Sequence, residues 1–480
     1  MRRFFPIFGW LGTYESSWLR TDLIAGATVW AVLIPSALAY AGIVGVDPIV
    51  GLYTVPLALA GYAVFGGSRL LVVGPDAALS VLSAATVASV LVGGEFLQLT
   101  IALAVVVGLI YLLMSVLHMG WIADLIPDPV LKGFIEGLVW VTILDQVPKV
   151  LGVSVEGGHS GFFRKLVDVV EVLPDTHTET AIVGIGCLAV LLLVRRFAHH
   201  LPGPLIVLLL AIATVAAFGL EGDGVAVVGE TSGGLAEFGL PTGVGLDTWL
   251  ALVPGALAMV VLGFTQSVGA AKRAAEQTGG QTDPDQELRA LGVANIGASL
   301  SGGFTVGGAL SKTAVAIGAG GKTQVGNLFA AVLGVLTILF LLPLFESLAF
   351  AALGAIVIVA MSGLSDLGYF KALWRIRKLE FAVAVAASAG VLAVGVLAGV
   401  VVGVLLSLVV LVEHIGRPPT AILVAAGTDR SWMFHWMPKR SRSLGCSSGD
   451  TMRRWSSSTP AGSPVNFSNS PSKSTIWKSS

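Results

Sequence analysis

Residues 70–80 read LLVVGPDAALS, and residues 304–312 read FTVGGALSK. Each stretch begins with bulky apolar and β-branched residues, which are typical of an extended strand. Each then passes through Val-Gly and, shortly after, into Ala-Leu-Ser. Pro75 suits the first turn of a helix, and the glycines let another group approach the backbone closely. The two stretches therefore predict two half-helices, each preceded by a short extended strand.

The composition around these stretches is that of a membrane protein. Of the 480 residues, 55% are hydrophobic and 12% are charged, against about 25% charged in soluble domains. The mean hydropathy is +0.87. Apolar runs long enough to cross a bilayer recur between Asp22 and Glu413. The net charge of −1 gives no indication of a nucleic-acid partner, so the expected surroundings are a lipid bilayer.

The apolar runs predict an all-α polytopic fold with fourteen transmembrane segments. We place the spans at 22–41, 49–66, 74–92, 97–119, 128–147, 180–197, 203–219, 249–271, 286–302, 307–320, 324–343, 349–364, 380–395 and 397–413. Repeat 1 covers about 22–220 and repeat 2 about 248–415. Because seven spans is an odd number, the second repeat must lie inverted relative to the first. The two unusual stretches then begin the third and tenth spans, at corresponding places.

Basic residues give the orientation. Those that fall on one side, if the spans alternate, are Arg2, Arg3, Arg20, Arg69, Arg195, Arg196, Lys272, Arg273, Lys322, Lys371, Arg375, Arg377, Lys378 and Arg417. The central loop from Glu221 to Asp247 holds no lysine or arginine and falls on the other side. The positive-inside rule then places residues 1–21 and the C-terminus on the cytoplasmic side of a bacterial-type inner membrane. Lys149, Arg164 and Lys165 are exceptions to this pattern.

Paired interrupted segments in inverted repeats indicate the central site of a transporter. A helix that starts within the membrane has unpaired N–H groups and a positive dipole end, which together favour an anion. Lys312, just after such a start, is interpreted as a fixed positive charge; the alternatives are a structural partner of a carboxylate and a residue that snorkels near a span end. Asp76 either caps its helix or couples transport to a proton or sodium ion. Two kinked but continuous helices remain the simpler alternative.

Other polar residues within the spans have weaker interpretations. Gln266 can hydrogen-bond either an anion or a neighbouring helix. The pairs Lys132/Glu136 and Asp145/Lys149 are each four residues apart and are expected to neutralise themselves along one helix. Glu287, at a predicted span end, is expected to be solvated. We find no set of residues typical of a metal site, a cofactor or a catalytic centre, so the chain is not expected to be an enzyme.

Several motifs, in order, resemble the SulP (sulfate permease) family of anion transporters over about residues 20–415. The residues that carry the resemblance are Pro35 to Ala41 with Pro48 and Gly51 to Tyr53; Phe65 to Arg69; Val73 to Pro75; Gly133, Phe134, Gly137 and Gln146; Gln286 to Leu288 with Leu291, Gly292 and Asn295; and Gly308 to Thr313. The resemblance implies a 7+7 inverted-repeat domain with a core and a gate, usually a homodimer. It also implies uptake or exchange of sulfate, bicarbonate, chloride or a dicarboxylate.

The same resemblance implies the position of the anion. It would lie between the two half-helix starts, touched by residues of the first span. Its implied contacts are Ser36, Tyr40, Ala77, Ala78, Leu79, Gly308, Ala309, Leu310, Ser311 and Lys312. Ser36 and Gln266 replace the glutamine and glutamate usual in the family, and Lys312 replaces an arginine. Because a neutral amide cannot titrate, Gln266 makes simple proton symport doubtful.

The C-terminal segment departs further from the family, whose members usually continue into a STAS domain of strands and helices. Residues 416–480 instead form a segment that is rich in Ser, Arg, Trp and Pro from Ser431 onward. We interpret this segment as a disordered basic tail without strands or helices. A reading-frame shift near Arg430 is one hypothesis for its origin, and a natural basic tail is the other.

These observations favour secondary active transport of a small inorganic anion by alternating access. The alternatives on the same fold are an uncoupled anion channel and a dicarboxylate or nucleobase permease. Acidic hydrogen-bonding partners in the eighth span would support the nucleobase alternative, and Gln266 is not one.

Overall fold

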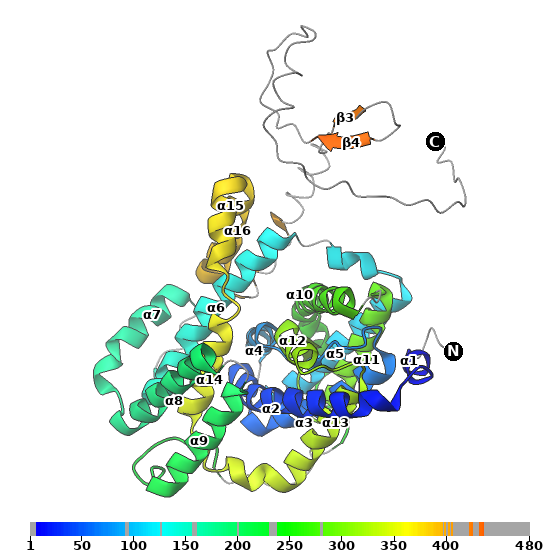
Figure 1. Cartoon of the computed structure of the whole chain (residues 1–480). Helices are drawn as coiled ribbons and strands as arrows, with labels where there is room; N and C mark the ends of the chain where they lie inside the picture. The colour runs from blue at the N-terminus through cyan, green and yellow to red at the C-terminus, as the bar shows by residue number, and fades with distance from the viewer. Residues whose placement is uncertain are drawn as a thin grey trace, which may run out of the picture. The chain divides into compact units, whose positions relative to one another are not determined.

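The computed structural model describes residues 6–91, 96–124, 127–155, 161–198, 201–229, 238–278 and 282–396, with short helical pieces between 398 and 406 and strands at 422–425 and 432–435. The chain divides into two units, Met1–Gly416 and Arg417–Ser480. Figure 1 shows the helices of the first unit in chain order.

The first unit is a helical membrane domain, as predicted, and seven of its described stretches are long and apolar enough to cross a bilayer. The helices of its first half are α1 (Ile7–Leu11), α2 (Leu19–Val44), α3 (Pro48–Phe65), α4 (Ala77–Val90), α5 (Phe96–Val116), α6 (Asp128–Leu151), α7 (Phe162–Glu171), α8 (Thr178–Phe197) and α9 (Gly203–Phe218). Those of its second half are α10 (Leu246–Thr278), α11 (Pro284–Leu300), α12 (Leu310–Gly318), α13 (Val325–Leu336), α14 (Phe350–Ser362), α15 (Leu367–Ile376) and α16 (Lys378–Val394).

Every predicted span before residue 397 coincides with one of these helices, and the span at 397–413 lies largely outside the described residues. The predicted 14-span, 7+7 inverted-repeat fold is confirmed. The helix ends differ most at α10, which continues to Thr278. The short helices α7 and α15 were not predicted because their polar residues interrupt the apolar runs.

The helices pack in two groups, which Figure 1 separates. We call α2–α5 with α10–α13 the core group, and α6–α9 with α14–α16 the gate group. Within the core group α11 packs on α3 and α5, and α13 packs on α2; within the gate group α6 packs on α14 and α16. Helix α2 joins the groups through α9 and α14. Each group takes matching elements from both repeats, as inversion requires.

Glycines allow the closest helix approaches. A Cβ at Gly26 of α2 would lie 2.3 Å from the carbonyl oxygen of Gly326 in α13. A Cβ at Gly133 of α6 would lie 2.1 Å from the carbonyl oxygen of Ala384 in α16. No real side chain tolerates such distances, so these crossings depend on glycine.

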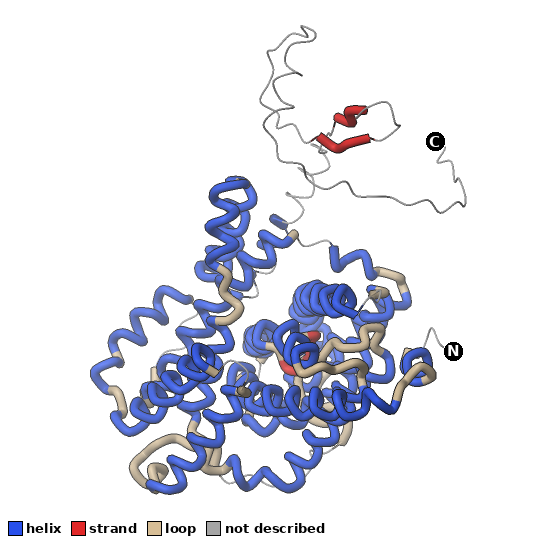
Figure 2. Tube along the Cα trace, in the orientation of Figure 1, coloured by secondary structure: helices blue, strands red, loops and turns tan. Residues whose placement is uncertain are grey.

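Two short strands lie among the core helices, drawn red in Figure 2. Strand β1 (Val73–Pro75) pairs antiparallel with β2 (Val306–Gly308), and Val73 lies opposite Gly308. Each strand leads directly into a half-helix, β1 into α4 and β2 into α12. The predicted strand–half-helix pairs are therefore confirmed.

The second unit contains two described strands, β3 (Ile422–Ala425) and β4 (Trp432–His435), which pair antiparallel. The expected absence of strands is wrong for these two segments. The other residues of this predicted tail lie outside the described part of the chain.

Candidate anion-binding site

Side chains replace the missing neighbours of strand β2. The Asn295 amide nitrogen donates to the carbonyl oxygen of Val306 at 3.0 Å, and the Asn295 amide oxygen accepts from the Val306 N–H at 2.9 Å. The Ser267 hydroxyl oxygen accepts from the Gly308 N–H at 2.8 Å. Unpaired backbone groups are costly in a membrane interior, so these two residues make the free edge of a two-stranded sheet tolerable there.

Strand β1 and the segment before it are held in the same way. Asn327 and Gln324 donate to the carbonyl oxygen of Leu71 at 2.9 and 3.0 Å. The Thr313 hydroxyl accepts from the Val72 N–H at 3.1 Å and donates to the Ala309 carbonyl at 2.7 Å. Because Thr313 belongs to α12, it connects the approach to one half-helix with the start of the other.

The space around β2 is filled by packing. A Cβ on Gly308 would lie 2.9 Å from Leu71 Cδ2 and 3.0 Å from Ser267 Cβ. A side chain at Gly308 would therefore have to displace Leu71, which precedes β1, and Ser267 of α10.

The two half-helix starts differ. The N-cap of α12 is Ala309, which has no side chain that can cap. The N–H groups of Leu310, Ser311 and Lys312 have no hydrogen-bond acceptor among the described residues. Leu310 is 42% exposed, and Ser311 is also exposed, so this helix start is open. Three unpaired N–H groups at the positive end of a helix form an arrangement suited to an oxyanion.

Helix α4 has its own cap instead. The Asp76 carboxylate accepts from the Ala78 N–H at 3.0 Å, so the capping interpretation of Asp76 describes what the side chain does. A carboxylate at this position offsets the positive end of α4. The side chains of Ala77, Ala78 and Leu79 are buried, so these residues could meet an anion only through their backbone.

The side chain of Lys312, in repeat 2, contacts β1 of repeat 1. It is only 3% exposed. The ammonium group donates to the carbonyl oxygen of Pro75 and lies 5.3 Å from the ring centroid of Tyr40. It forms no ion pair with a described carboxylate. An ammonium has three N–H donors, and a ring face attracts a cation. Lys312 thus holds the end of β1 and keeps its positive charge beside the start of α12.

The remaining predicted contacts lie on α2 and α10. The Tyr40 hydroxyl has no hydrogen-bond partner among the described residues, whereas the Ser36 hydroxyl donates to Val32 at 2.7 Å within its own helix. Gln266 is half-buried, also without a described partner, and it precedes Ser267, which touches β2. Sequence reasoning missed Ser267, because a lone serine in an apolar span carries no signal.

The predicted pairing along α6 is wrong. Lys132 forms an ion pair with Asp366 at 3.1 Å, and Asp145 forms one with Lys165 at 2.5 Å. Lys149 donates to the carbonyl oxygen of Gly42 at 2.9 Å. Helix spacing permits the local pairs, but α7, α2 and the N-cap of α15 offer these charges other partners.

The expected solvation of Glu287 is also wrong, since its side chain is fully buried. Its carboxylate accepts from the Tyr62 hydroxyl at 2.6 Å and from the Ser68 N–H at 3.0 Å. Glu287 therefore ties α11 to the segment that leads into β1.

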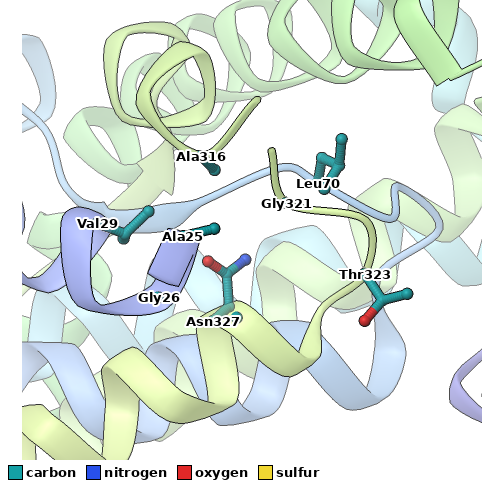
Figure 3. Close-up of a pocket in the computed structure, with 9 residues that line it drawn as sticks. Ala25, Gly26, Val29, Leu70, Ala316, Gly321, Thr323 and Asn327 are labelled. Atoms are coloured by element: carbon teal, nitrogen blue, oxygen red, sulfur yellow. The ribbon is translucent and has the colours of Figure 1, made fainter. Parts of the chain in front are cut away.

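Figure 3 shows a small pocket between α2, α12, α13 and the segment at Leu70. Its volume of about 10 Å³ is that of a single water molecule at most. A larger apolar groove of about 380 Å³ lies between α8 and α9. In the described part of the chain, no three His, Cys, Asp or Glu side chains are grouped to hold a metal ion.

Comparison with known proteins agrees with this architecture. The model of the sulfate permease family matches residues 19–387. Probable sulfate transporter MT1781 of Mycobacterium tuberculosis (strain CDC 1551 / Oshkosh) is 37% identical over 412 residues, which cover 85% of this chain and 73% of that protein. Sulfate transporter 4.1, chloroplastic, of Arabidopsis thaliana is 32% identical over 432 residues, which cover 87% of this chain and 62% of that protein.

Two solved structures share the fold. The murine Solute Carrier 26 family member A9 anion transporter superimposes with a TM-score of 0.79 at 22% identity, over 90% of this chain and 74% of that one. The transmembrane domain of a cyanobacterium bicarbonate transporter, BicA, superimposes with a TM-score of 0.71 at 22% identity, over 82% of this chain and 98% of that domain. The chain is an integral, multi-pass membrane protein of the sulfate permease family of anion transporters.

Proposed function

We propose that this protein is a secondary active transporter of a small inorganic anion of the sulfate or bicarbonate type. The observation that carries the proposal is the open start of α12, where three backbone N–H groups lack a described acceptor beside the buried charge of Lys312. The names of the relatives point to the same class of substrate: two are named as sulfate transporters and one as a bicarbonate transporter.

In this proposal the anion sits against Leu310, Ser311 and Lys312, facing Tyr40. Because Asp76 already occupies the start of α4, the two half-helices contribute unequally, and most of the attraction comes from α12. The Gln266 amide and the Tyr40 hydroxyl have no described partners. Both are neutral hydrogen-bond donors, so they are the groups proposed to donate to the oxyanion. Gly308 lets Leu71 and Ser267 pack against the backbone of β2 and makes no side-chain contact with the anion.

The core group carries the site, and the gate group lies beside it. Alternating access follows if the core group moves against the gate group and exposes the site to each side in turn. The proposal also places the protein in a bacterial-type inner membrane as a homodimer, with both termini in the cytoplasm. Asp76 is proposed to couple transport to a proton or sodium ion.

The test is uptake into liposomes that contain the purified full-length protein. Labelled sulfate, bicarbonate and dicarboxylates are compared under proton, sodium and no gradient. We expect saturable flux of one inorganic anion, inhibited by the others. If none of these anions moves or binds, the proposal is wrong. Non-saturating currents that depend steeply on voltage would instead establish the channel alternative.

A further inference from the structure

Two of the short helices that hydropathy did not predict, α7 and α15, differ in charge. Helix α7 contains Arg164 and Lys165 but also Asp168 and Glu171, so its charges balance. Helix α15 contains Lys371 and Arg375 and no acidic residue within Leu367–Ile376. Arg377 and Lys378 follow it directly. One of the two helices is therefore strongly basic and the other is not.

The basic residues of α15 are available for binding. Lys371 and Arg375 are four residues apart and so share one helix face. Both are exposed, and neither forms an ion pair with a carboxylate in the described part of the chain. Arg377, in contrast, pairs with Glu380 at 2.5 Å. Lys371 and Arg375 thus present two uncompensated positive charges.

Apolar side chains flank these charges. Leu367 is 65% exposed, Trp374 56% and Ile376 78%, whereas Leu373 is buried against the protein. In a membrane domain, an amphipathic helix with exposed Leu and Ile, a tryptophan and basic residues suits the headgroup region. The apolar residues then enter the acyl boundary while the cations stay among the headgroups.

We propose that α15 lies in the headgroup region and that Lys371 and Arg375 bind the headgroups of anionic phospholipids. A free anion would account for the two charges but not for the exposed apolar surfaces of Leu367 and Ile376, nor for the exposed part of Trp374, whose ring also packs edge-on against Phe381 at a centroid distance of 4.9 Å. The positive-inside pattern of the sequence also predicts that this helix lies on the cytoplasmic side, where anionic lipid attracts basic segments.

The contacts around α15 connect a bound lipid to the gate group. Asp366 caps the helix by accepting from the Tyr369 N–H at 3.1 Å, and the same residue pairs with Lys132 of α6 at 3.1 Å. The neighbouring Ser365 hydroxyl donates to Glu136 of α6 at 2.9 Å. Because the start of α15 is fixed to α6, the lipid that holds α15 also holds one side of the gate group. The rate of transport is then expected to depend on the lipid.

Lipid binding is tested by quenching tryptophan fluorescence with brominated lipids. The full-length protein is placed in phosphatidylcholine vesicles that contain either brominated phosphatidylglycerol or brominated phosphatidylcholine. The difference between wild type and Trp374→Phe isolates the emission of Trp374. We expect the anionic lipid to quench this emission several-fold more at equal mole fraction, and high salt to reduce the preference.

The double variant Lys371→Gln/Arg375→Gln should lose nearly all of this several-fold preference, since each cation near an anionic surface contributes up to roughly fivefold. Lys371→Arg/Arg375→Lys should keep it. Arg195→Gln/Arg196→Gln is the matched control, because it removes two exposed cations at the end of α8 instead. Equal quenching of wild type by both lipids would overturn the proposal, as would an equal loss in the α8 control. Neither result depends on whether an anion is transported.

Discussion

The side-chain ammonium of Lys312, in the first turn of α12, donates to the carbonyl oxygen of Pro75 at the end of β1, 237 residues earlier in the chain. One residue therefore links the two repeats where their half-helices begin. The link leaves two N–H donors of the ammonium unassigned, so the same group can meet an anion at the open start of α12. A structural role and a binding role are combined in one side chain.

Replacing Lys312 should weaken anion binding more than it weakens the fold. In Lys312→Met the apolar stem remains, and the hydrogen bonds from a charged donor, each contributing about 1.5–3 kcal/mol, are lost. We expect the KM for the transported anion to rise by about tenfold to a hundredfold. The measurement is initial uptake over a range of anion concentrations, with the thermal midpoint of the purified protein followed in parallel. Lys312→Arg, which retains the charge, should stay closer to wild type, and an unchanged KM in Lys312→Met would exclude this lysine from the site.

A bulky side chain at Ser311 should block the site. Ser311 is exposed at the start of α12, so an indole can be accommodated there without displacing the core. Ser311→Trp is expected to abolish saturable uptake while the protein still folds. Ala314→Trp, an equally large change at an exposed position one turn further along α12, is the control and should retain most of the uptake. Equal uptake by both variants would place the anion elsewhere.

The coupling role of Asp76 can be separated from its capping role. Asparagine caps a helix about as well as aspartate does, but it carries no charge and cannot titrate. If Asp76 couples transport, Asp76→Asn should keep its stability and lose the stimulation of uptake by a proton or sodium gradient. Asp47→Asn is the control, since Asp47 caps α3 in the same way by accepting from the Ile49 N–H at 2.9 Å. Unchanged gradient dependence in Asp76→Asn would remove Asp76 from coupling.

The amide of Asn295 should be essential for the outer edge of β2. In Asn295→Asp, an oxygen replaces the nitrogen that donates to the carbonyls of Leu291 and Val306 at 2.9 and 3.0 Å. Leaving buried acceptors without donors costs about 1–3 kcal/mol each. We expect a lower thermal midpoint and reduced uptake. Ser36→Ala, which removes a hydroxyl bonded only within its own helix, should change the midpoint far less. A variant Asn295→Asp as stable as wild type would show that this edge tolerates unpaired groups.

The sequence was informative where a pattern has one physical solution. Long apolar runs, separated by loops that carry basic residues on one predicted side only, indicate transmembrane spans. The Val-Gly pairs followed by small residues, at matching places in both halves, indicated β1–α4 and β2–α12. Partner choice between distant segments was not predictable. Glu287 looked like a solvated span end, but the loop at Ser68 folds over it. Lys132 had a partner four residues away, yet pairs with Asp366, which is distant in sequence.

The amphipathic helices were missed for a related reason. Helix α15 is too short and too basic to be predicted as a span. Some of its apolar side chains are buried in the protein and others are exposed, and an average hydropathy does not distinguish the two. For Asp76 the sequence identified the residue but not its role, because both capping and coupling were consistent with an aspartate at this position. The structure assigns the cap through the Ala78 N–H, while coupling depends on a proton or ion that geometry alone does not reveal.

The pairing of β1 with β2 has a consequence for selectivity. Backbone hydrogen bonds such as that from the Ala309 N–H to the Val72 carbonyl, at 3.0 Å, join the two half-helix starts. The distance between these starts is then held by strand pairing and is expected to stay the same whichever side of the membrane is open. An anion arriving from the cytoplasm and one arriving from outside should meet the same binding surface and be ranked in the same order of affinity. Net direction would then be decided by the gradients alone.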